Sequence, residues 1–149
     1  MKLNPYLNFN GNCRAAMEFY HKCLGGEIAF AVTYADMPQS DDSDAHGGCA
    51  VEVDMAQMGD MMAHMRLEAG EVVIMASDCP PAAFEAAAGT TCALQVDSVA
   101  EAARIFAALS EGGQVFMPLG PTDWAEAFAM FKDKFGIPWM VNYEGSKAA

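Results

Sequence analysis

The sequence predicts an α+β fold made of two βαβββ modules. A segment that reads strand, polar turn, helix, Gly-Gly, strand occurs twice, shifted by about 87 positions, so that Gly25-Gly26 corresponds to Gly112-Gly113. A pattern typical of a β-hairpin follows in each copy. Two such copies indicate two similar half-domains, and a ligand site built from two halves usually lies between them.

The first module is expected over residues 1–78. An apolar run at Leu3 to Phe9 predicts a strand, and Asn12 is expected to cap a helix that ends at Leu24 before Gly25-Gly26. Cys13, Ala16, Met17, Tyr20 and Leu24 form one apolar stripe on that helix. A strand at Glu27 to Tyr34 and a hairpin of Met61 to Leu67 with Glu71 to Ser77 complete the module.

An acidic insertion at 36–60 interrupts the first module, and no Lys or Arg occurs between Met37 and Asp60. Such a stretch buries too little apolar area to order itself, so we expect a mobile loop. Residues 79–89, which begin Cys79-Pro80-Pro81, are the predicted linker, since Pro-Pro does not fit inside a strand or helix.

The second module is expected over residues 90–149. Thr90 to Val96 predicts a strand, Ser98 to Ser110 a helix, and Gln114 to Met117 a further strand. A last hairpin should join Phe128 to Phe131 with Ile137 to Asn142 across the turn Asp133-Lys134-Phe135-Gly136.

The charge of the chain excludes some classes of partner. The 149 residues carry a formal net charge of −12 and a pI near 4.3, which oppose binding to nucleic acid or anionic membranes. Cationic ligands remain compatible with this field. No signal peptide or membrane-spanning stretch is found, so a cytoplasmic protein is expected. The five cysteines show no Cys-x-x-Cys spacing, which favours reduced, buried thiols over disulfides or a zinc site.

Several motifs together resemble the vicinal oxygen chelate superfamily, which includes glyoxalase I, bleomycin-resistance proteins and extradiol dioxygenases, and in particular its PhnB-like branch. They cover nearly the whole chain outside the acidic insertion. They are Tyr6-Leu7-Asn8-Phe9 with Gly11-Asn12, Phe19-Tyr20 before Leu24-Gly25-Gly26, Gly70 to Met75 with Ser77-Asp78, Gly112-Gly113 before Val115-Phe116-Met117-Pro118, and Asp133 to Asn142.

The resemblance implies that both modules supply strands to one cupped mixed sheet, with the helices on the outer face and the ligand in the cup. Metal-using members hold a divalent cation there through His or Glu side chains on the first and last strand of each module. The matching positions here are Pro5, Met75, Thr91 and Met140, and none is a usual ligand for a hard cation. No cofactor is therefore expected, while a divalent metal at other residues stays an alternative.

His64 and Asp78 are the candidate catalytic residues. His64 alternates with an apolar set on its predicted strand and so faces the cup, where it could act as a general base. Asp78 could orient His64 or cap the following turn. A satisfied structural histidine and a capping aspartate are the alternative interpretations of the two residues.

The predicted ligand-binding cup has an apolar floor and a few amides. Its residues are Leu7, Met75, Thr91, Gln95, Met140 and Asn142, with Trp124 as a lid over the mouth. The many methionines could instead fill the core or bind Cu(I). Asp41, Asp42, Asp44 and His46 could hold a cation loosely, but they lack the glycine and distal Glu of an EF-hand.

Two functional hypotheses follow. The first is a small-molecule-binding protein of the bleomycin-resistance type, without the usual metal ligands, whose cup is completed in a homodimer and favours a cationic or amphipathic ligand. The second is a superfamily enzyme, a lyase, isomerase or dioxygenase, that uses His64 and Asp78 or a non-standard metal site. Because the Gly-Gly pairs follow helices, whereas phosphate loops precede them, nucleotide binding is disfavoured, and no glycine loop for S-adenosylmethionine is present.

Overall fold

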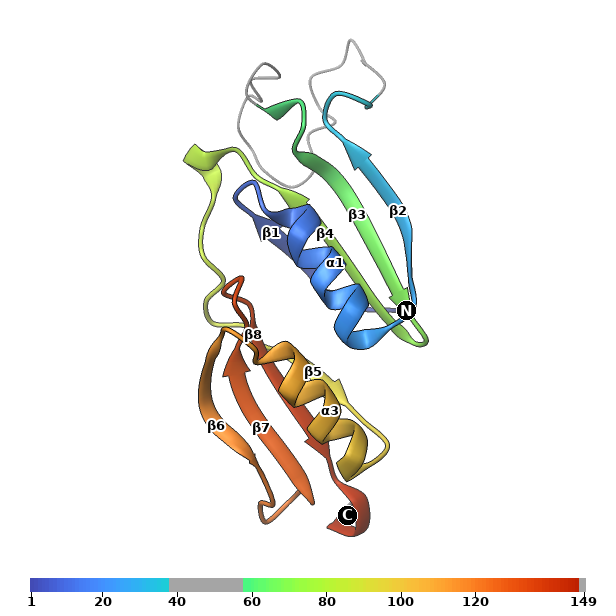
Figure 1. Ribbon diagram of the computed structural model, residues 1–149, viewed down its shortest axis with the longest axis vertical. Coiled ribbons are helices and arrows are strands. Elements are labelled where there is room, and N and C mark those ends of the chain that lie inside the picture. Colours follow the sequence, from blue (N-terminus) through green and yellow to red (C-terminus); the bar gives the residue numbers. More distant parts are fainter. Residues whose placement is uncertain (38–57, 148–149) are drawn as a thin grey trace. The chain divides into compact units, whose positions relative to one another are not determined.

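The computed structural model describes residues 1–37 and 58–147 (Figure 1). The chain divides into two compact units, Met1–Glu85 and Ala86–Ala149. The division falls inside the segment 79–89, where a linker is expected. Within the described residues each unit shows a helix packed on a four-stranded mixed sheet, so the predicted α+β fold class with two βαβββ modules is confirmed.

The sheet of the first unit has the strand order β1-β4-β3-β2. Its elements are β1 (Tyr6–Phe9), α1 (Cys13–Leu24), β2 (Glu27–Thr33), β3 (Met62–Ala69) and β4 (Val72–Asp78). Strands β1 and β4 are parallel, whereas β4, β3 and β2 pair antiparallel. A short 3₁₀ turn, η1 (Pro81–Ala83), follows β4.

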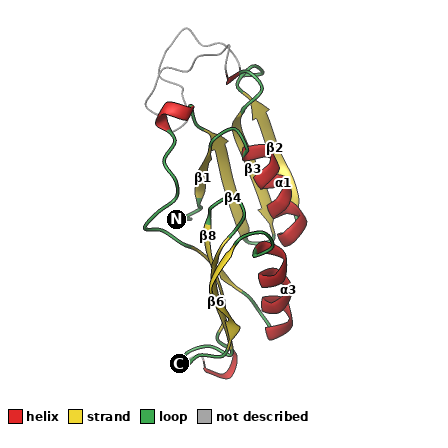
Figure 2. Ribbon diagram, turned by 60° about the vertical axis from the view of Figure 1, so that its left-hand side comes forward, coloured by secondary structure: helices red, strands yellow, loops and turns green. Residues whose placement is uncertain are grey.

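The second unit repeats this order as β5-β8-β7-β6. Its elements are β5 (Cys92–Gln95), α3 (Val99–Leu109), β6 (Gln114–Gly120), β7 (Ala127–Lys132) and β8 (Pro138–Tyr143), followed by the 3₁₀ turn η2 (Gly145–Lys147). Strand β5 is parallel to β8, and the other pairs are antiparallel. In each unit the helix covers one face of its own sheet (Figure 2).

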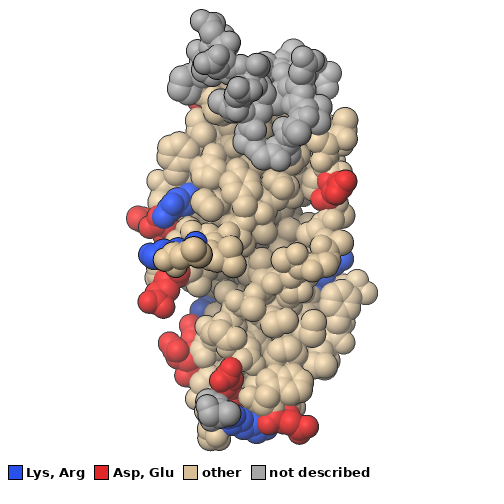
Figure 3. Space-filling view, turned by 180° about the vertical axis from the view of Figure 1, so that it is seen from behind, with Lys and Arg blue, Asp and Glu red and all other residues tan. Residues whose placement is uncertain are grey.

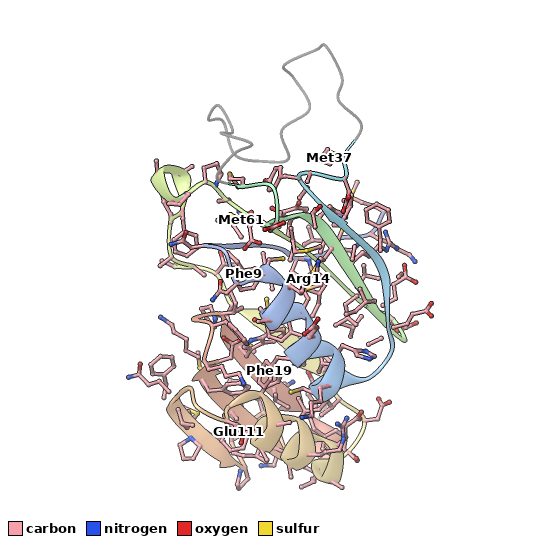
Figure 4. The ribbon with its side chains drawn as sticks, turned by 45° about the horizontal axis from the view of Figure 1, so that its top comes forward. Phe9, Arg14, Phe19, Met37, Met61 and Glu111 are labelled. Atoms are coloured by element: carbon pink, nitrogen blue, oxygen red, sulfur yellow. The ribbon has the colours of Figure 1, made fainter. Side chains whose placement is uncertain are left out.

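The core of each unit lies between its helix and that face of the sheet. Ala16, Met17 and Tyr20 of α1 are fully buried, as are Leu67 and Ala76 on the strands. Figure 4 shows Phe9, at the end of β1, next to the start of α1. Burial alternates along β3, whose odd-numbered residues face the helix. Of the predicted helix stripe, Cys13, Ala16, Met17 and Tyr20 are buried, whereas Leu24 is only half-buried and Cys23 is buried in its place.

The repeated Gly-Gly pairs have a steric reason. A Cβ at Gly26 would overlap the carbonyl oxygen of Glu68, and a Cβ at Gly113 would overlap the carbonyl oxygen of Lys132. In each unit the chain leaving the helix thus passes directly against the backbone at the hairpin end, and only glycine leaves room for it. The repeat reflects close packing at the same point of both modules.

Three details differ from the sequence predictions. β1 begins at Tyr6 and β5 at Cys92, because the residues before them lie outside the ladder pairing. The expected Asn12 side-chain cap of α1 does not form. Cys13, Cys23 and Cys92 are not disulfide-bonded, whereas Cys79 is, so the expectation of reduced thiols was wrong for Cys79.

No helix within the described part of the chain is long and apolar enough to cross a membrane. The acidic insertion at 36–60 falls mostly on residues 38–57, which lie outside the described residues, and the expectation of a mobile loop there stays a prediction.

Candidate functional site

The face of each sheet opposite its helix carries most of the candidate residues, and we call it the helix-free face. In the first unit it is defined by ladder partners on one side of the sheet: Tyr6, Asn8, Phe30, His64, Arg66, Met75 and Ser77. In the second unit the corresponding residues are Ala93, Gln95, Met117, Phe128, Met130, Met140 and Asn142.

His64 lies on the helix-free face of the first unit, as its alternation predicts, between two aromatic rings. The Tyr6 hydroxyl oxygen is 3.2 Å from Nδ1 of His64, and the two rings stack with centroids 5.7 Å apart. The Phe30 ring packs 5.8 Å away, tilted by 48°. Burial, and then the nearby Arg66 guanidinium, lower the pKa of His64. A neutral imidazole can accept the Tyr6 proton at Nδ1 and present Nε2–H to a ligand.

Asp78 does not orient His64, because it points to the opposite face of the sheet. It is 2% exposed, its Oδ1 accepts the backbone N–H of Cys13 at 2.9 Å, and its Oδ2 accepts that of Met62 at 2.9 Å. Its backbone carbonyl accepts the hydroxyl of Tyr34 at 2.8 Å. Asp78 therefore joins the start of α1 to the start of β3, and its expected pairing with His64 is not formed.

An amide pair lies on the helix-free face of the second unit. Asn142 on β8 stands opposite Gln95 on β5, and its Nδ2 donates to Oε1 of Gln95 at 2.8 Å. Asn142 is 6% exposed, and among the described residues its Oδ1 has no hydrogen-bond partner. Since buried polar atoms are nearly always paired, this oxygen is available to a donor brought by a ligand or a water molecule.

Thioethers and aromatic rings surround this amide pair. Met140 precedes Asn142 on the same face, Met130 stands opposite Met140, and Met117 stands opposite Met130. Phe128 is the ladder partner of Asn142. The Trp124 ring packs edge-on against the Phe128 ring, with the ring centroids 5.5 Å apart. Trp124 is 54% exposed. The face thus combines an apolar, polarisable surface with one unpaired acceptor.

The first unit carries a weaker copy of the amide pair. Asn8 and Ser77 occupy the positions that correspond to Gln95 and Asn142, and the Ser77 hydroxyl lies 3.5 Å from Oδ1 of Asn8. The repeat therefore extends to the polar groups of the helix-free faces. In the view from behind, charged side chains lie mainly at the margins and uncharged atoms occupy the middle (Figure 3).

Three of the expected positions were wrong, Pro5 and Leu7 by one residue and Thr91 by two. Tyr6, not Pro5, stands opposite Met75, while Pro5 only contributes the carbonyl that accepts the N–H of Met75 at 3.1 Å. Leu7 is buried on the helix-covered face, opposite Ala76, so it does not line the cup. Thr91 lies one residue before β5, and Ala93 stands opposite Met140.

The corrected first and last strand positions are Tyr6 with Met75 and Ala93 with Met140. None of these carries an imidazole or carboxylate, so the residues present do not fit the divalent cation of metal-using relatives. Within residues 1–37 and 58–147 no group of three or more His, Cys, Asp or Glu side chains is placed to hold a metal. Asp41, Asp42, Asp44 and His46 lie outside the described residues.

Sequence reasoning missed Tyr6, Phe30, Phe128 and Met130. The 87-position shift carries a usable signal, since it pairs Tyr6-Leu7-Asn8-Phe9 with Ala93-Leu94-Gln95-Val96 and so gives the correct face for Tyr6 and Leu7. The place of Phe30 beside His64 depends on a register shift in β2 that no local pattern reveals.

Comparisons with known proteins agree with this architecture. Residues 2–141 match the family model described as Glyoxalase/Bleomycin resistance protein/Dioxygenase superfamily. The chain is 34% identical over 142 residues to Protein YjdN of Escherichia coli K12, and the aligned region covers 95% of each chain. The crystal structure of protein PA1353 from Pseudomonas aeruginosa has 45% identity and a TM-score of 0.82, with 97% of this chain and 98% of that chain covered. A PhnB protein from Bacillus cereus has the same fold, with a TM-score of 0.72 at 21% identity over 96% and 99% of the two chains.

Proposed function

Because the chain belongs to the glyoxalase/bleomycin resistance protein/dioxygenase superfamily, we propose that it binds a small molecule in the manner of the bleomycin-resistance members. The ligand lies on the helix-free face of the second unit and is held without the metal ligands of the superfamily's enzymes. The observation that carries the proposal is the buried, unpaired Oδ1 of Asn142.

The side chains around Asn142 define the ligand class. An N–H or O–H group of the ligand donates to Oδ1 of Asn142, and the exposed Gln95 offers a further amide contact beside it. Met140, Met130 and Phe128 contact an apolar or aromatic body, since thioethers adapt to varied shapes. The formal charge of −12 favours a ligand whose donor is an amine or amidine over one with a carboxylate.

A panel of matched compounds tests this proposal. Each pair consists of a benzylammonium compound and its N,N,N-trimethyl counterpart, which keeps the ring and the positive charge but has no N–H donor. Binding is measured by calorimetry. We expect the N–H member to bind more tightly by about 3- to 10-fold, which corresponds to one hydrogen bond of ordinary net strength. Equal affinity across all pairs would contradict a role for the Asn142 acceptor.

Single-residue variants test where on the protein the ligand binds. Asn142→Leu removes the acceptor and should abolish the preference within each pair, whereas Ser77→Ala changes the corresponding position of the first unit and serves as the control. Met140→Ala should weaken binding of both members through lost apolar contact. If Met75→Ala and Met140→Ala both leave the affinity of every compound unchanged, the ligand does not lie on these faces.

The alternative function is an enzyme that uses His64. The contact between the Tyr6 hydroxyl and Nδ1, together with the lowered pKa of His64, favours a neutral imidazole that could exchange protons at neutral pH. Asp78 has no part in it, because both of its carboxylate oxygens accept backbone N–H groups. His64→Ala would abolish turnover of an enzyme but change ligand affinity only modestly in a binding protein.

A homodimer is part of the proposal, as is a cytoplasmic location. A dimer is suggested by the exposed hydrophobic side chains of the edge strand β6: Val115, Phe116 and Met117 are 44%, 55% and 40% exposed. Light scattering at working concentration should give twice the chain mass of 15.9 kDa. A mass near that of one chain would contradict the dimer without affecting the ligand-binding proposal.

A further inference from the structure

The C-terminal turn of the second unit is fastened to the loop that carries Trp124. Figure 1 shows this turn at the same end of the sheet as the connection between β6 and β7. Oε1 of Glu126 accepts the backbone N–H of Ser146 at 2.9 Å and the hydroxyl of the same residue at 2.6 Å. The Lys147 ammonium donates to the carbonyl of Thr122. Two side chains from the two segments thus make reciprocal contacts.

The loop between these contacts is itself a closed turn. The N–H of Thr122 donates to the carbonyl of Ala125 at 2.9 Å, and the N–H of Ala125 donates to the Thr122 hydroxyl at 3.1 Å. Trp124 lies inside this turn, between the two points where the C-terminal segment is attached. Since Ala125 is fully buried, the turn has an anchor on the unit, and Trp124 has little freedom to leave it.

Trp124 connects this arrangement to the proposed ligand face. Its ring packs edge-on against Phe128 at 5.5 Å with an interplanar angle of 74°, and Phe128 is the ladder partner of Asn142. An exposed Trp ring held against Phe128, the ladder partner of Asn142, offers contact area at small cost in conformational entropy. A ring that moved freely would lose part of this contribution on binding.

We propose that Glu126 is a positioning residue: through Ser146 and the C-terminal turn it holds Trp124 against Phe128, and so sets the affinity of the helix-free face for aromatic ligands. The inference rests on the proposed function for its effect on affinity. Its effect on Trp124 itself is independent of any ligand.

Tight packing supports a specific role for the turn. Gly145 has φ +58°, and a Cβ there would overlap the carboxylate of Glu126. The turn therefore lies directly against the end of the Glu126 side chain. The pKa of Glu126 is lowered, chiefly by the hydrogen bonds from the Ser146 side chain and backbone, so the carboxylate accepts both bonds at neutral pH.

Time-resolved fluorescence anisotropy with acrylamide quenching tests the proposal. Trp139 is 1% exposed and Trp124 is 54% exposed, so acrylamide selects Trp124 in the unmodified chain. Glu126→Ala should increase the amplitude of the fast component of the anisotropy decay. Because this component comes from the exposed Trp124, acrylamide should remove it. Glu126→Gln keeps the acceptor oxygen and should behave as wild type. Glu144→Ala, at an exposed neighbouring position, is the control. An unchanged decay in Glu126→Ala would overturn the proposal.

Binding of the cationic aromatic dye ethidium supplies the second readout. Glu126→Ala should weaken it by about 2- to 10-fold, the range of one ordinary hydrogen bond, and Glu126→Gln should restore it. Ser146→Ala removes only the hydroxyl bond to Glu126 and keeps the backbone bond, so it should weaken ethidium binding less than Glu126→Ala does. If Trp124 becomes mobile in Glu126→Ala but ethidium affinity is unchanged, the link between Glu126 and the ligand face is overturned. If ethidium does not bind the wild-type protein, the result counts against the proposed function, and the anisotropy test alone decides the role of Glu126.

Discussion

The carboxylate of Asp78, at the end of β4, accepts the backbone N–H of Cys13 at a distance of 2.9 Å across 65 positions of sequence. This contact supplies the N-terminal cap of α1 that Asn12 does not provide. The same side chain accepts the N–H of Met62 at the start of β3. One buried carboxylate therefore fixes the starts of α1 and β3, and the role of Asp78 is structural.

Asp78→Ala should be strongly destabilising, because it leaves two buried N–H groups without acceptors. Each unpaired donor costs about 1–3 kcal/mol, so the free energy of unfolding should fall by about 2–6 kcal/mol. Asp78→Asn retains one acceptor and should cost less. Urea denaturation measures both, with the exposed Glu71→Ala as the control. A loss no larger than that of the control would show that the carboxylate is dispensable.

Gly26→Ala and Gly113→Ala should each destabilise the protein by about 1–3 kcal/mol, because the added methyl group overlaps a main-chain carbonyl oxygen, and at Gly26 the φ of +79° adds a conformation that alanine disfavours. Gly120→Ala is the matched control, since nothing lies within 4 Å of a Cβ at that position. In thermal denaturation, the melting temperature of Gly120→Ala should be clearly higher than those of Gly26→Ala and Gly113→Ala. The account of the Gly-Gly repeat fails if all three variants melt together.

His64 should titrate below its ordinary pKa of 6.5, and two substitutions should raise that pKa. Phe30→Ala opens the ring to water, and Arg66→Gln removes the nearby positive charge. Histidine proton shifts followed by NMR measure the pKa, with His64→Gln identifying the resonance. Arg14→Gln on α1, beyond the other face of the sheet, should change nothing. A pKa of 6.5 or above in the wild type would contradict the burial of this ring.

The same shift predicts how stability depends on pH. Because the folded-state pKa of His64 lies below the unfolded value, the folded protein binds fewer protons in this range. The free energy of unfolding should therefore fall as the pH drops from about 6.5 through the folded-state pKa. Comparing wild type with His64→Gln at pH 5 and pH 8 isolates this contribution, and an equal difference at both pH values would contradict it.

The repeat made most of the fold predictable from sequence. Apolar stripes and Gly-Gly pairs give the helices and their ends, and the turn at Asp133 is recoverable because its carboxylate has fixed local partners, the N–H groups of Phe135 and Ile137. The indole N–H of Trp139 also donates to Asp133, so hydrogen bonds join the start of the motif Asp133 to Asn142 to its strand. Such signals are local or periodic, so a single sequence contains them.

The site was less predictable, because it depends on contacts between distant strands. The partner of Asp78 on α1 is 65 positions away, and nothing in the local sequence distinguishes this cap from an ordinary turn residue. Tyr6 and Leu7 exchange faces if the register of β1 slips by one position, and the slip placed Pro5 and Leu7 in the cup wrongly. His64 was placed on the correct face because it lies within a longer alternating strand, and Met140 and Asn142 because they lie within the motif Asp133 to Asn142. Gln95 lies on the same face, opposite Asn142.

The most direct test of the central claim is the affinity of the best-binding benzylammonium compound, measured by calorimetry for wild type and Asn142→Leu, each with and without excess chelator. The account predicts that the chelator leaves wild-type affinity unchanged, while Asn142→Leu weakens it about 3- to 10-fold under both conditions. A large loss on chelation, with little effect of Asn142→Leu, would contradict it and indicate a metal held by residues other than those of the helix-free face.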